Sequence, residues 1–264
     1  MQRSNAHSTE NQSRSFSRRD VLSLGALAVA GCLLPGSARG AAKRRVVVWS
    51  EGTAPKNVYP RDINTAIAEG LQSLADWEVV TAGLAEPDQG LSDARLNQTD
   101  VLIWWGHQKH GQVSDGLVDR IERRVKEQGM GFIALHSSHF AKPYKRLMGT
   151  RCSWREYKAD GTSARIHVKL PDHPIARGVR DFDLPKIEFY GEPFAVPEPE
   201  AVPLDGLYTR PDGTTEPCRM GLCWTVGKGR VFYFVPGHET YDDFFRPEVR
   251  QILRNAVEWA APKP

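Results

Sequence analysis

The hydrophobic positions near the start of the folded region change from a strand pattern to a helix pattern. Residues 44–50 centre on a β-branched run, which is typical of a strand buried on both faces of a parallel sheet. A polar loop ending at Pro60 follows, and then apolar residues return at helical spacing, namely Ile63, Ile67, Leu71 and Leu74. This order of strand, loop and helix predicts the first part of a βαβ unit.

The same alternation recurs along the chain. Ser114 can cap a helix with one apolar side, and Gly129 or Gly131 ends it. A last amphipathic helix begins at Pro247. Further strands are expected at residues 77–81, 100–105, 131–135 and 229–235. Strands that alternate with helices require right-handed crossovers, so the pattern predicts an α/β fold with a doubly wound, mostly parallel sheet.

The middle of the chain departs from this pattern. Residues 152–227 are rich in proline and glycine and contain short alternating segments such as 164–170. Alternation of this kind is typical of antiparallel strands with one solvated face. We therefore expect antiparallel excursions here, with loops that cover one end of the sheet.

The N-terminus carries the pattern of a secretory signal. A polar, charged stretch ends in Arg18-Arg19, an apolar run covers residues 21–34, and small residues follow. The run is too short for a membrane span. The paired arginines resemble a twin-arginine signal, with Val21 in place of the usual Phe. The sequence therefore predicts a twin-arginine signal peptide over residues 1–40 and a periplasmic mature domain over residues 41–264.

Two ways of processing this signal peptide stay open. Ala38-Arg39-Gly40 suits cleavage after Gly40, which would release the protein without a transmembrane span. Val29-Ala30-Gly31-Cys32 also fits a lipobox, in which Cys32 would carry a lipid anchor. Three cysteines remain in the mature domain: Cys152, Cys218 and Cys223. An odd number argues against a full disulfide framework, and a Cys218–Cys223 bridge is optional.

Charge adds little to the list of partners. The chain has 35 basic and 32 acidic residues, a formal net charge of +3, and much of the excess lies in the first 45 residues. The mature domain is therefore close to neutral, and we expect no nucleic-acid partner.

Histidines cluster where the predicted strands end. In an open parallel sheet, ligands bind beyond the carboxyl ends of the strands. Four segments follow strands, and three of them carry histidine; the segments are Trp49–Glu51, Trp105–His107, His136–His139 and Gly237–Glu239. We therefore expect the side chains of His107, His136 and His238 to approach one point.

The motifs around these segments resemble the ThuA-like (trehalose-utilisation) family, over about residues 44–261. They are Val46-Val47-Val48-Trp49, Val101-Leu102-Ile103-Trp104-Trp105-Gly106-His107, Ala134-Leu135-His136-Ser137-Ser138-His139-Phe140, Asp172-His173-Pro174-Ile175, Glu188-Phe189-Tyr190-Gly191-Glu192 and Phe232-Tyr233-Phe234-Val235-Pro236-Gly237-His238-Glu239-Thr240-Tyr241. The resemblance implies the flavodoxin-like fold of class I glutamine amidotransferases. At the turn where those enzymes carry a nucleophilic cysteine this chain has His136, so we expect no glutamine hydrolysis.

Converging imidazoles suggest a metal site or an acid–base site. His107, His136 and His238, with Glu239 or Glu192 nearby, could bind zinc or another divalent metal with one open position. The alternative is a hydrogen-bonded histidine cluster that binds a polar ligand without metal. His136, His238 and Glu239 are the candidate catalytic residues in either case, and no nucleotide cofactor is expected.

An aromatic and acidic wall is the second candidate feature. Glu188, Tyr190 and Glu192 alternate, so their side chains should share one face of an extended segment. Aromatic rings and carboxylates together suit a small-molecule carbohydrate, although an ordinary strand with core aromatics fits the pattern equally. The candidate substrate-binding residues are Trp49, Trp105, Ser137, His139, Tyr190, Glu192 and Tyr241, with Trp154 beside them.

The resemblance implies a role in carbohydrate catabolism. ThuA-like proteins are associated with use of trehalose and related disaccharides, often through 3-keto sugars. A ketone beside an acidic C–H needs a base and an electrophile, which histidine, glutamate or a metal supplies. We therefore expect a hydrolase, lyase or isomerase acting on a keto sugar, and the alternative is a non-catalytic sugar-binding or accessory protein.

Overall fold

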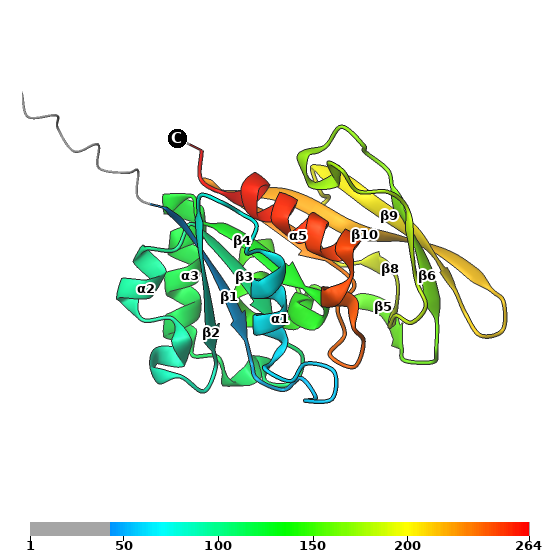
Figure 1. Ribbon diagram of the computed structural model, residues 1–264, viewed down its shortest axis with the longest axis horizontal. Coiled ribbons are helices and arrows are strands. Elements are labelled where there is room, and N and C mark those ends of the chain that lie inside the picture. The colour runs from blue at the N-terminus through cyan, green and yellow to red at the C-terminus, as the bar shows by residue number, and fades with distance from the viewer. Residues whose placement is uncertain (1–42, 264) are drawn as a thin grey trace, which may run out of the picture. The chain divides into compact units, whose positions relative to one another are not determined.

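The computed structural model describes residues 43–263. The predicted signal peptide, the cleavage site after Gly40 and the lipobox at Cys32 lie outside them. The described part folds around a nine-stranded sheet in the order β2-β1-β3-β4-β11-β10-β9-β6-β7 (Figure 1). The strands of this sheet are β1 Arg44–Ser50, β2 Trp77–Gly83, β3 Val101–Trp105, β4 Gly131–Leu135, β6 Ser163–Val168, β7 Phe182–Leu184, β9 Ala201–Thr209, β10 Thr215–Val226 and β11 Gly229–Phe234.

The first half of the sheet is parallel, as the continuous apolar runs predict. Neighbouring strands β2, β1, β3, β4 and β11 all pair in parallel. All residues of β3 and β4 are buried, which explains why these strands show no polar alternation. Strand order reverses between β1 and β3, so this half has the doubly wound topology, and its carboxyl ends form one edge.

Helices cover both faces of the parallel half. They are α1 Ile63–Gly70, α2 Asp93–Asn97, α3 Asp115–Gln128, α4 Lys142–Met148 and α5 Pro247–Ala260. Helix α1 packs beside α5, in front of the sheet in Figure 1, whereas α2 and α4 pack beside α3. Right-handed crossovers from β1 toward one edge and from β3 toward the other place α1 and α3 on opposite faces.

The capping residues of α3 confirm the prediction made for this helix. Ser114 Oγ accepts a hydrogen bond from Leu117 N at 3.3 Å, and Gly129 ends the helix in a left-handed conformation with φ 79°. Helix α1 is shorter than the apolar spacing suggests: it ends at Gly70, and Leu71 and Leu74 are buried in the turns that follow.

The antiparallel strands extend the main sheet instead of only covering one end of it. Strand β10 pairs antiparallel with β11 on one side and with β9 on the other, and β6 and β7 continue outward from β9. A separate two-stranded sheet pairs β5, Trp154–Lys158, with β8, Phe189–Phe194. Short 3₁₀ helices complete the described part: Pro87–Gly90, His110–Gln112, His136–Phe140, Pro174–Ala176 and Asp243–Phe245.

The cysteines of the described part are all unbridged. Cys152, Cys218 and Cys223 are buried free thiols, so the optional Cys218–Cys223 bridge is not formed. Burial raises the pKa of the thiols of Cys218 and Cys223 well above the ordinary value, which keeps them protonated and unreactive. None of the helices in residues 43–263 has the length and apolarity to cross a membrane.

Candidate functional site

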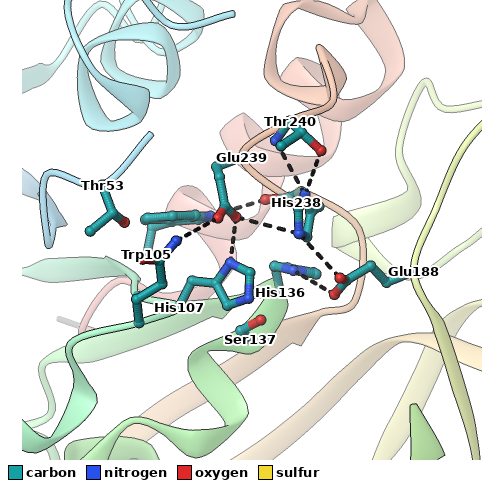
Figure 2. A network of polar contacts seen from close by, with 12 residues as sticks. Thr53, Trp105, His107, His136, Ser137, Glu188, His238, Glu239 and Thr240 are labelled. Atoms are coloured by element: carbon teal, nitrogen blue, oxygen red, sulfur yellow. Dashed lines mark hydrogen bonds and ion pairs between the residues drawn. The ribbon is translucent and has the colours of Figure 1, made fainter. Parts of the chain in front are cut away.

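Three histidines meet at the carboxyl edge of the parallel strands. His107 follows β3, His136 follows β4 and His238 follows β11, and these three strands are neighbours in the sheet. The ring centroids lie 5.5 Å apart for His107 and His136, 5.0 Å for His107 and His238, and 5.1 Å for His136 and His238 (Figure 2). The convergence expected from the positions of the strand ends is therefore present in the fold.

A buried carboxylate completes this group. Glu188 lies just before β8 and is 1% exposed. Its Oε2 lies 3.2 Å from His136 Nε2, and its Oε1 lies 3.1 Å from His238 Nε2. One ligand atom from each of these four residues lies within 4.8 Å of the others. We call His107, His136, Glu188 and His238 the His/Glu cluster.

The outer nitrogen of each imidazole has its own partner. His107 Nδ1 bonds Glu239 Oε2 at 2.5 Å, and His136 Nδ1 lies 3.3 Å from the carbonyl of Val235. His238 Nδ1 lies 2.8 Å from Thr240 Oγ1. A hydrogen-bond partner on Nδ1 fixes the orientation of the imidazole ring and leaves Nε2 to face the centre of the cluster. Metal-binding histidines usually show this arrangement.

Backbone geometry holds two of the histidines in place. His136 has φ 53°, in the left-handed region, at the sharp turn between β4 and the 3₁₀ helix that follows. Before His238, Gly237 has φ 118°, donates its N–H to Asp243 Oδ2 at 3.1 Å and accepts from Trp105 Nε1 at 3.0 Å. These contacts define where both imidazoles enter the cluster.

The carboxylates of the site are ionised. Burial alone would raise the pKa of Glu188, but its close contacts with His136 and His238 outweigh this effect and hold that pKa well below its ordinary value. The pKa of Glu239 falls to about 2, because the bond from His107 outweighs the effect of burial in the same way. The site therefore carries two negative charges at neutral pH.

The histidines respond differently to this environment. Burial lowers the pKa of His136 more than its contacts with Glu188 raise it, so this imidazole is neutral near pH 7. For His107, burial is opposed by the hydrogen bond and charge of Glu239, and the net result is a raised pKa. Only His107 and His238 have partly exposed side chains, at 22% and 14%, so the cluster opens to solvent on their side.

The loop after β3 is fixed by two carboxylates. Gln108 Nε2 donates to Glu239 Oε1 at 3.1 Å. The buried carboxylate of Glu51, at the end of β1, accepts hydrogen bonds from the backbone N–H groups of Gln108 and Lys109. Glu51 thus positions the segment that carries His107, although it does not enter the cluster itself.

A hydrogen-bonded chain runs from the cluster toward the β5–β8 sheet. Tyr190 OH donates to Glu188 Oε2 at 3.1 Å, and Ser137 Oγ lies 3.2 Å from the same phenol oxygen. Both side chains are buried. Of these two substrate-binding candidates, Tyr190 therefore contacts Glu188 directly, and Ser137 contacts Tyr190.

The tryptophans expected in an aromatic wall lie in the core. Trp49 is 1% exposed and stacks on Trp104 at 3.7 Å, and Trp105 is fully buried. Trp154 stacks on Phe194 at 4.0 Å. Trp49 and Trp105 belong to strands buried on both faces, which direct aromatic side chains into packing layers. Together with Trp154, which is 9% exposed, these rings pack in the core and do not line an open wall.

Two other expected residues also lie apart from the cluster. Glu192 pairs with Arg219 of β10 at 2.8 Å, so it does not share the position of Glu188 as the alternation suggested. His139 Nδ1 donates to the carbonyl of Cys152 at 2.8 Å, and burial lowers the pKa of this imidazole to about 3. Tyr241 does border the cluster, with its ring 5.1 Å from that of His238.

The donor set of the cluster fits a divalent metal ion. Three imidazole nitrogens and one carboxylate oxygen suit zinc and related transition metals. His136 Nε2 is buried and has no hydrogen-bond partner, because its approach to Glu188 lacks the geometry of a hydrogen bond. A buried nitrogen left without a partner is costly unless a further ligand meets it, and a metal ion at the centre would do so.

Comparison with known proteins assigns the family. The ThuA family, described as trehalose utilisation, matches residues 45–260. The chain belongs to the ThuA family. No curated protein matches the chain significantly.

Solved structures share the fold of this ThuA domain. A ThuA-like protein from Bacteroides uniformis has a TM-score of 0.60 at 15% identity, covering 85% of this chain and 94% of its own. A cytoplasmic protein from Salmonella typhimurium has a TM-score of 0.59 at 14% identity, covering 83% and 99%. A glutamine amidotransferase from Thermotoga maritima has a TM-score of 0.50 at 12% identity, covering 82% and 97%.

Several residues of the site are not apparent from the sequence. The alternation with Tyr190 and Glu192 places Glu188 in the aromatic and acidic wall and not with the histidines, and no motif of their own marks Gln108 or Thr240. The signal for Gln108 and Thr240 was their place beside His107 and Glu239 in the strand-end segments. Glu188 follows no predicted parallel strand, so only the pairing of β8 with β5 brings it to this edge.

Proposed function

We propose that this chain is an enzyme that acts on a keto sugar related to trehalose, at a divalent metal centre formed by the His/Glu cluster. The family assignment supports the substrate class. The observation that carries the proposal is the geometry of the cluster, in which four ligand atoms from four different segments lie within 4.8 Å of one another. The outer contacts of the three imidazoles support metal binding over a chance cluster.

Each residue of the site has a role in this proposal. His107, His136, Glu188 and His238 hold the ion, which when bound polarises the carbonyl group of the sugar. Tyr190 holds Glu188 through its phenol, and Glu51 holds the loop of His107. The exposed side of the cluster, at His107 and His238, is where the sugar enters.

Glu239 is the proton acceptor. It is ionised, it lies 3.7 Å from His238 Nε2, and it is not needed as a ligand. The C–H group beside a ketone is acidic, so its proton passes to the Glu239 carboxylate while the electron pair of the C–H bond moves toward the carbonyl oxygen. The low pKa makes Glu239 a weak base alone, and a bound metal ion would offset this by polarising the ketone. Isomerisation and elimination both begin in this way.

Elemental analysis and an assay test the proposal together. Protein purified without chelator should contain about one equivalent of zinc or a similar metal per chain. It should consume 3-keto-trehalose, followed by NMR, and lose this activity in a chelator until metal is restored. His136→Ala should remove metal and activity while the free energy of unfolding changes by no more than about 2 kcal/mol. Full activity without metal would overturn the proposal.

The alternative is a sugar-binding protein without catalysis. The observation in its favour is that Glu188 and Glu239 already offer hydrogen-bond acceptors to His107 and His238 without a metal. In that case the protein would contain no metal and bind trehalose unchanged in the presence of chelator. We further propose that the protein reaches the periplasm by the twin-arginine route, from the pattern at Arg18-Arg19.

A further inference from the structure

A cavity lies close to the His/Glu cluster. It has a volume of about 620 Å³ and starts at Thr240 and Tyr241, directly after Glu239 in the chain. Its remaining lining comes from the loop before α1, the segment before β8 and the segment before α5: Asn57, Val58, Pro185, Lys186, Asp242, Asp243, Phe245 and Arg246. We call this space the Tyr241 cavity.

Tyr241 connects the cavity with the cluster. Its ring lies 5.1 Å from the ring of His238, tilted by 40°. Its carbonyl oxygen accepts a hydrogen bond from the buried Tyr59 OH at 2.5 Å, which fixes the backbone at this point. The pKa of Tyr241 is raised, by burial first and then by the charge of Glu188. The same side chain therefore borders the metal-binding residues on one side and the cavity on the other.

The lining of the cavity has the chemistry that a sugar ring requires. Asn57, Lys186 and Asp242 offer hydrogen-bond donors and acceptors for hydroxyl groups. Tyr241 and Phe245, the latter 39% exposed, offer aromatic faces for the apolar C–H face of a ring. A cavity of this volume lies within the range of small-molecule sites.

The lining of the cavity carries charged groups of both signs. Lys186 and Arg246 lie with Asp242 and Asp243, and the Arg246 guanidinium lies 3.8 Å from the carboxyl group of each of these two acidic residues. The hydroxyl groups of a sugar can therefore meet both donors and acceptors here.

We propose that the Tyr241 cavity is the subsite for the second ring of a disaccharide whose first ring lies at the His/Glu cluster. The inference rests on the proposed function, because it takes the first ring to be the reacting sugar. Tyr241 borders both the cluster and the cavity, and Asn57 lies on an exposed turn in the lining of the cavity. The cavity thus selects disaccharides over single sugars.

Filling the cavity tests the subsite. Asn57→Trp places a large ring in the cavity, Asn57→Ala keeps it open, and Leu207→Trp adds a tryptophan at an exposed position of β9 remote from the site. Binding is measured by titration calorimetry with trehalose and methyl α-glucoside and with the 3-keto form of each. Asn57→Trp should weaken disaccharide binding by about five-fold or more and change single-ring binding by less than about two-fold. Leu207→Trp should match the wild type. Asn57→Ala removes one hydrogen-bonding group and should weaken disaccharide binding less than Asn57→Trp does.

The outcomes separate this inference from the proposed function. If wild-type protein binds the single ring and Asn57→Trp affects neither sugar or both equally, the subsite is wrong and the proposed function survives. If the wild type binds none of the four sugars, the proposed function fails and the subsite with it. Should Asn57→Trp not fold, Tyr241→Ala replaces it, and equal losses for one-ring and two-ring sugars would overturn the subsite.

Discussion

Glu239 accepts a hydrogen bond from Nδ1 of His107 at 2.5 Å, although the two residues are 132 positions apart. The contact joins the loop after β3 to the loop after β11 and turns His107 Nε2 toward the cluster. A carboxylate on the outer nitrogen also raises the basicity of a ligating imidazole. Glu239 therefore has two roles in the proposed enzyme, orienting His107 and accepting a proton.

Removal of Glu239 should weaken metal binding as well as catalysis. In Glu239→Ala, His107 loses its outer partner, so the affinity for zinc should fall by about 10- to 100-fold. The measurement is a competition titration against a zinc-binding dye. Glu239→Gln keeps an acceptor for His107 and should bind metal more tightly than the alanine variant, yet it should remain inactive because it cannot take a proton. Equal affinities for wild type and Glu239→Ala would contradict the orienting role.

Glu188 and Glu192 form a matched pair for testing the carboxylate ligand. The two residues lie four positions apart, but Glu188 contacts His136 and His238 whereas Glu192 pairs with Arg219. Glu188→Gln should lower the metal content of purified protein to a small fraction of the wild-type value, and Glu192→Gln should leave it unchanged. Elemental analysis of both variants, with circular dichroism to verify folding, shows which of the two carboxylates metal binding requires. Metal loss only in Glu192→Gln would refute the assignment.

The position of the histidines could be predicted from the sequence because it depends on parallel strands alone. Parallel strands end at one edge, so residues directly after β3, β4 and β11 must lie close together once these strands are neighbours. The fold class follows from the same continuous apolar runs. Neither inference needs the antiparallel part of the chain.

The position of Glu188 could not be predicted in this way. It depends on the pairing of β5 with β8, which joins segments distant in sequence and contains a register shift between Trp154 and Glu156. The orientation of Trp49 was equally inaccessible, because a strand buried on both faces has no polar alternation to show which face each side chain takes. Its ring stacks on Trp104 instead of reaching the cleft.

Asp243 should make stability depend on pH. It is 2% exposed, and burial raises its pKa from 3.8 to about 7. The folded state therefore retains this proton up to about pH 7, whereas the unfolded chain releases it near pH 3.8. The contribution of the group is fully present below pH 3.8 and is lost as the pH rises toward 7.

Asp243→Asn removes this titration and can still accept from Gly237 N. It should match the wild type near pH 4 and be more stable near pH 8, by at most on the order of 4 kcal/mol. Urea unfolding at both pH values measures the difference. The contrary outcome is that Asp243→Asn is less stable than the wild type at pH 8, and by the same amount as at pH 4. This would show that the ionised carboxylate is better tolerated than its burial implies.

Export tests the interpretation of the N-terminus. Twin-arginine recognition depends on the guanidinium pair and not on charge alone, so Arg18→Lys with Arg19→Lys should abolish transport while the precursor accumulates. Fractionation with an immunoblot measures it, and normal periplasmic yield would contradict the proposed route. Labelled fatty acid on the wild-type protein, lost in Cys32→Ala, would favour the lipid anchor over cleavage after Gly40.

Gly237 offers a test of how the backbone positions His238. Its φ of 118° strains any other residue, and a Cβ atom there would lie 2.4 Å from Cζ of the buried Phe244 ring. Gly237→Ala must therefore shift the loop, which should cost about 1–3 kcal/mol of stability. The shift also moves His238 away from Glu188. The free energy of metal binding should therefore change by more than the free energy of unfolding.

The matched control for this variant is Gly111→Ala, in the exposed 3₁₀ helix after His107, where a Cβ atom meets nothing within 4 Å. It should preserve both melting temperature and zinc affinity. The decisive comparison is zinc affinity of the two variants at a temperature where both are fully folded, since general destabilisation lowers the folded fraction but not the affinity of folded molecules. If folded Gly237→Ala binds zinc as tightly as Gly111→Ala, then the position of His238 does not depend on this turn. In that case His238 is either not a metal ligand or is held in place by another contact, such as Thr240.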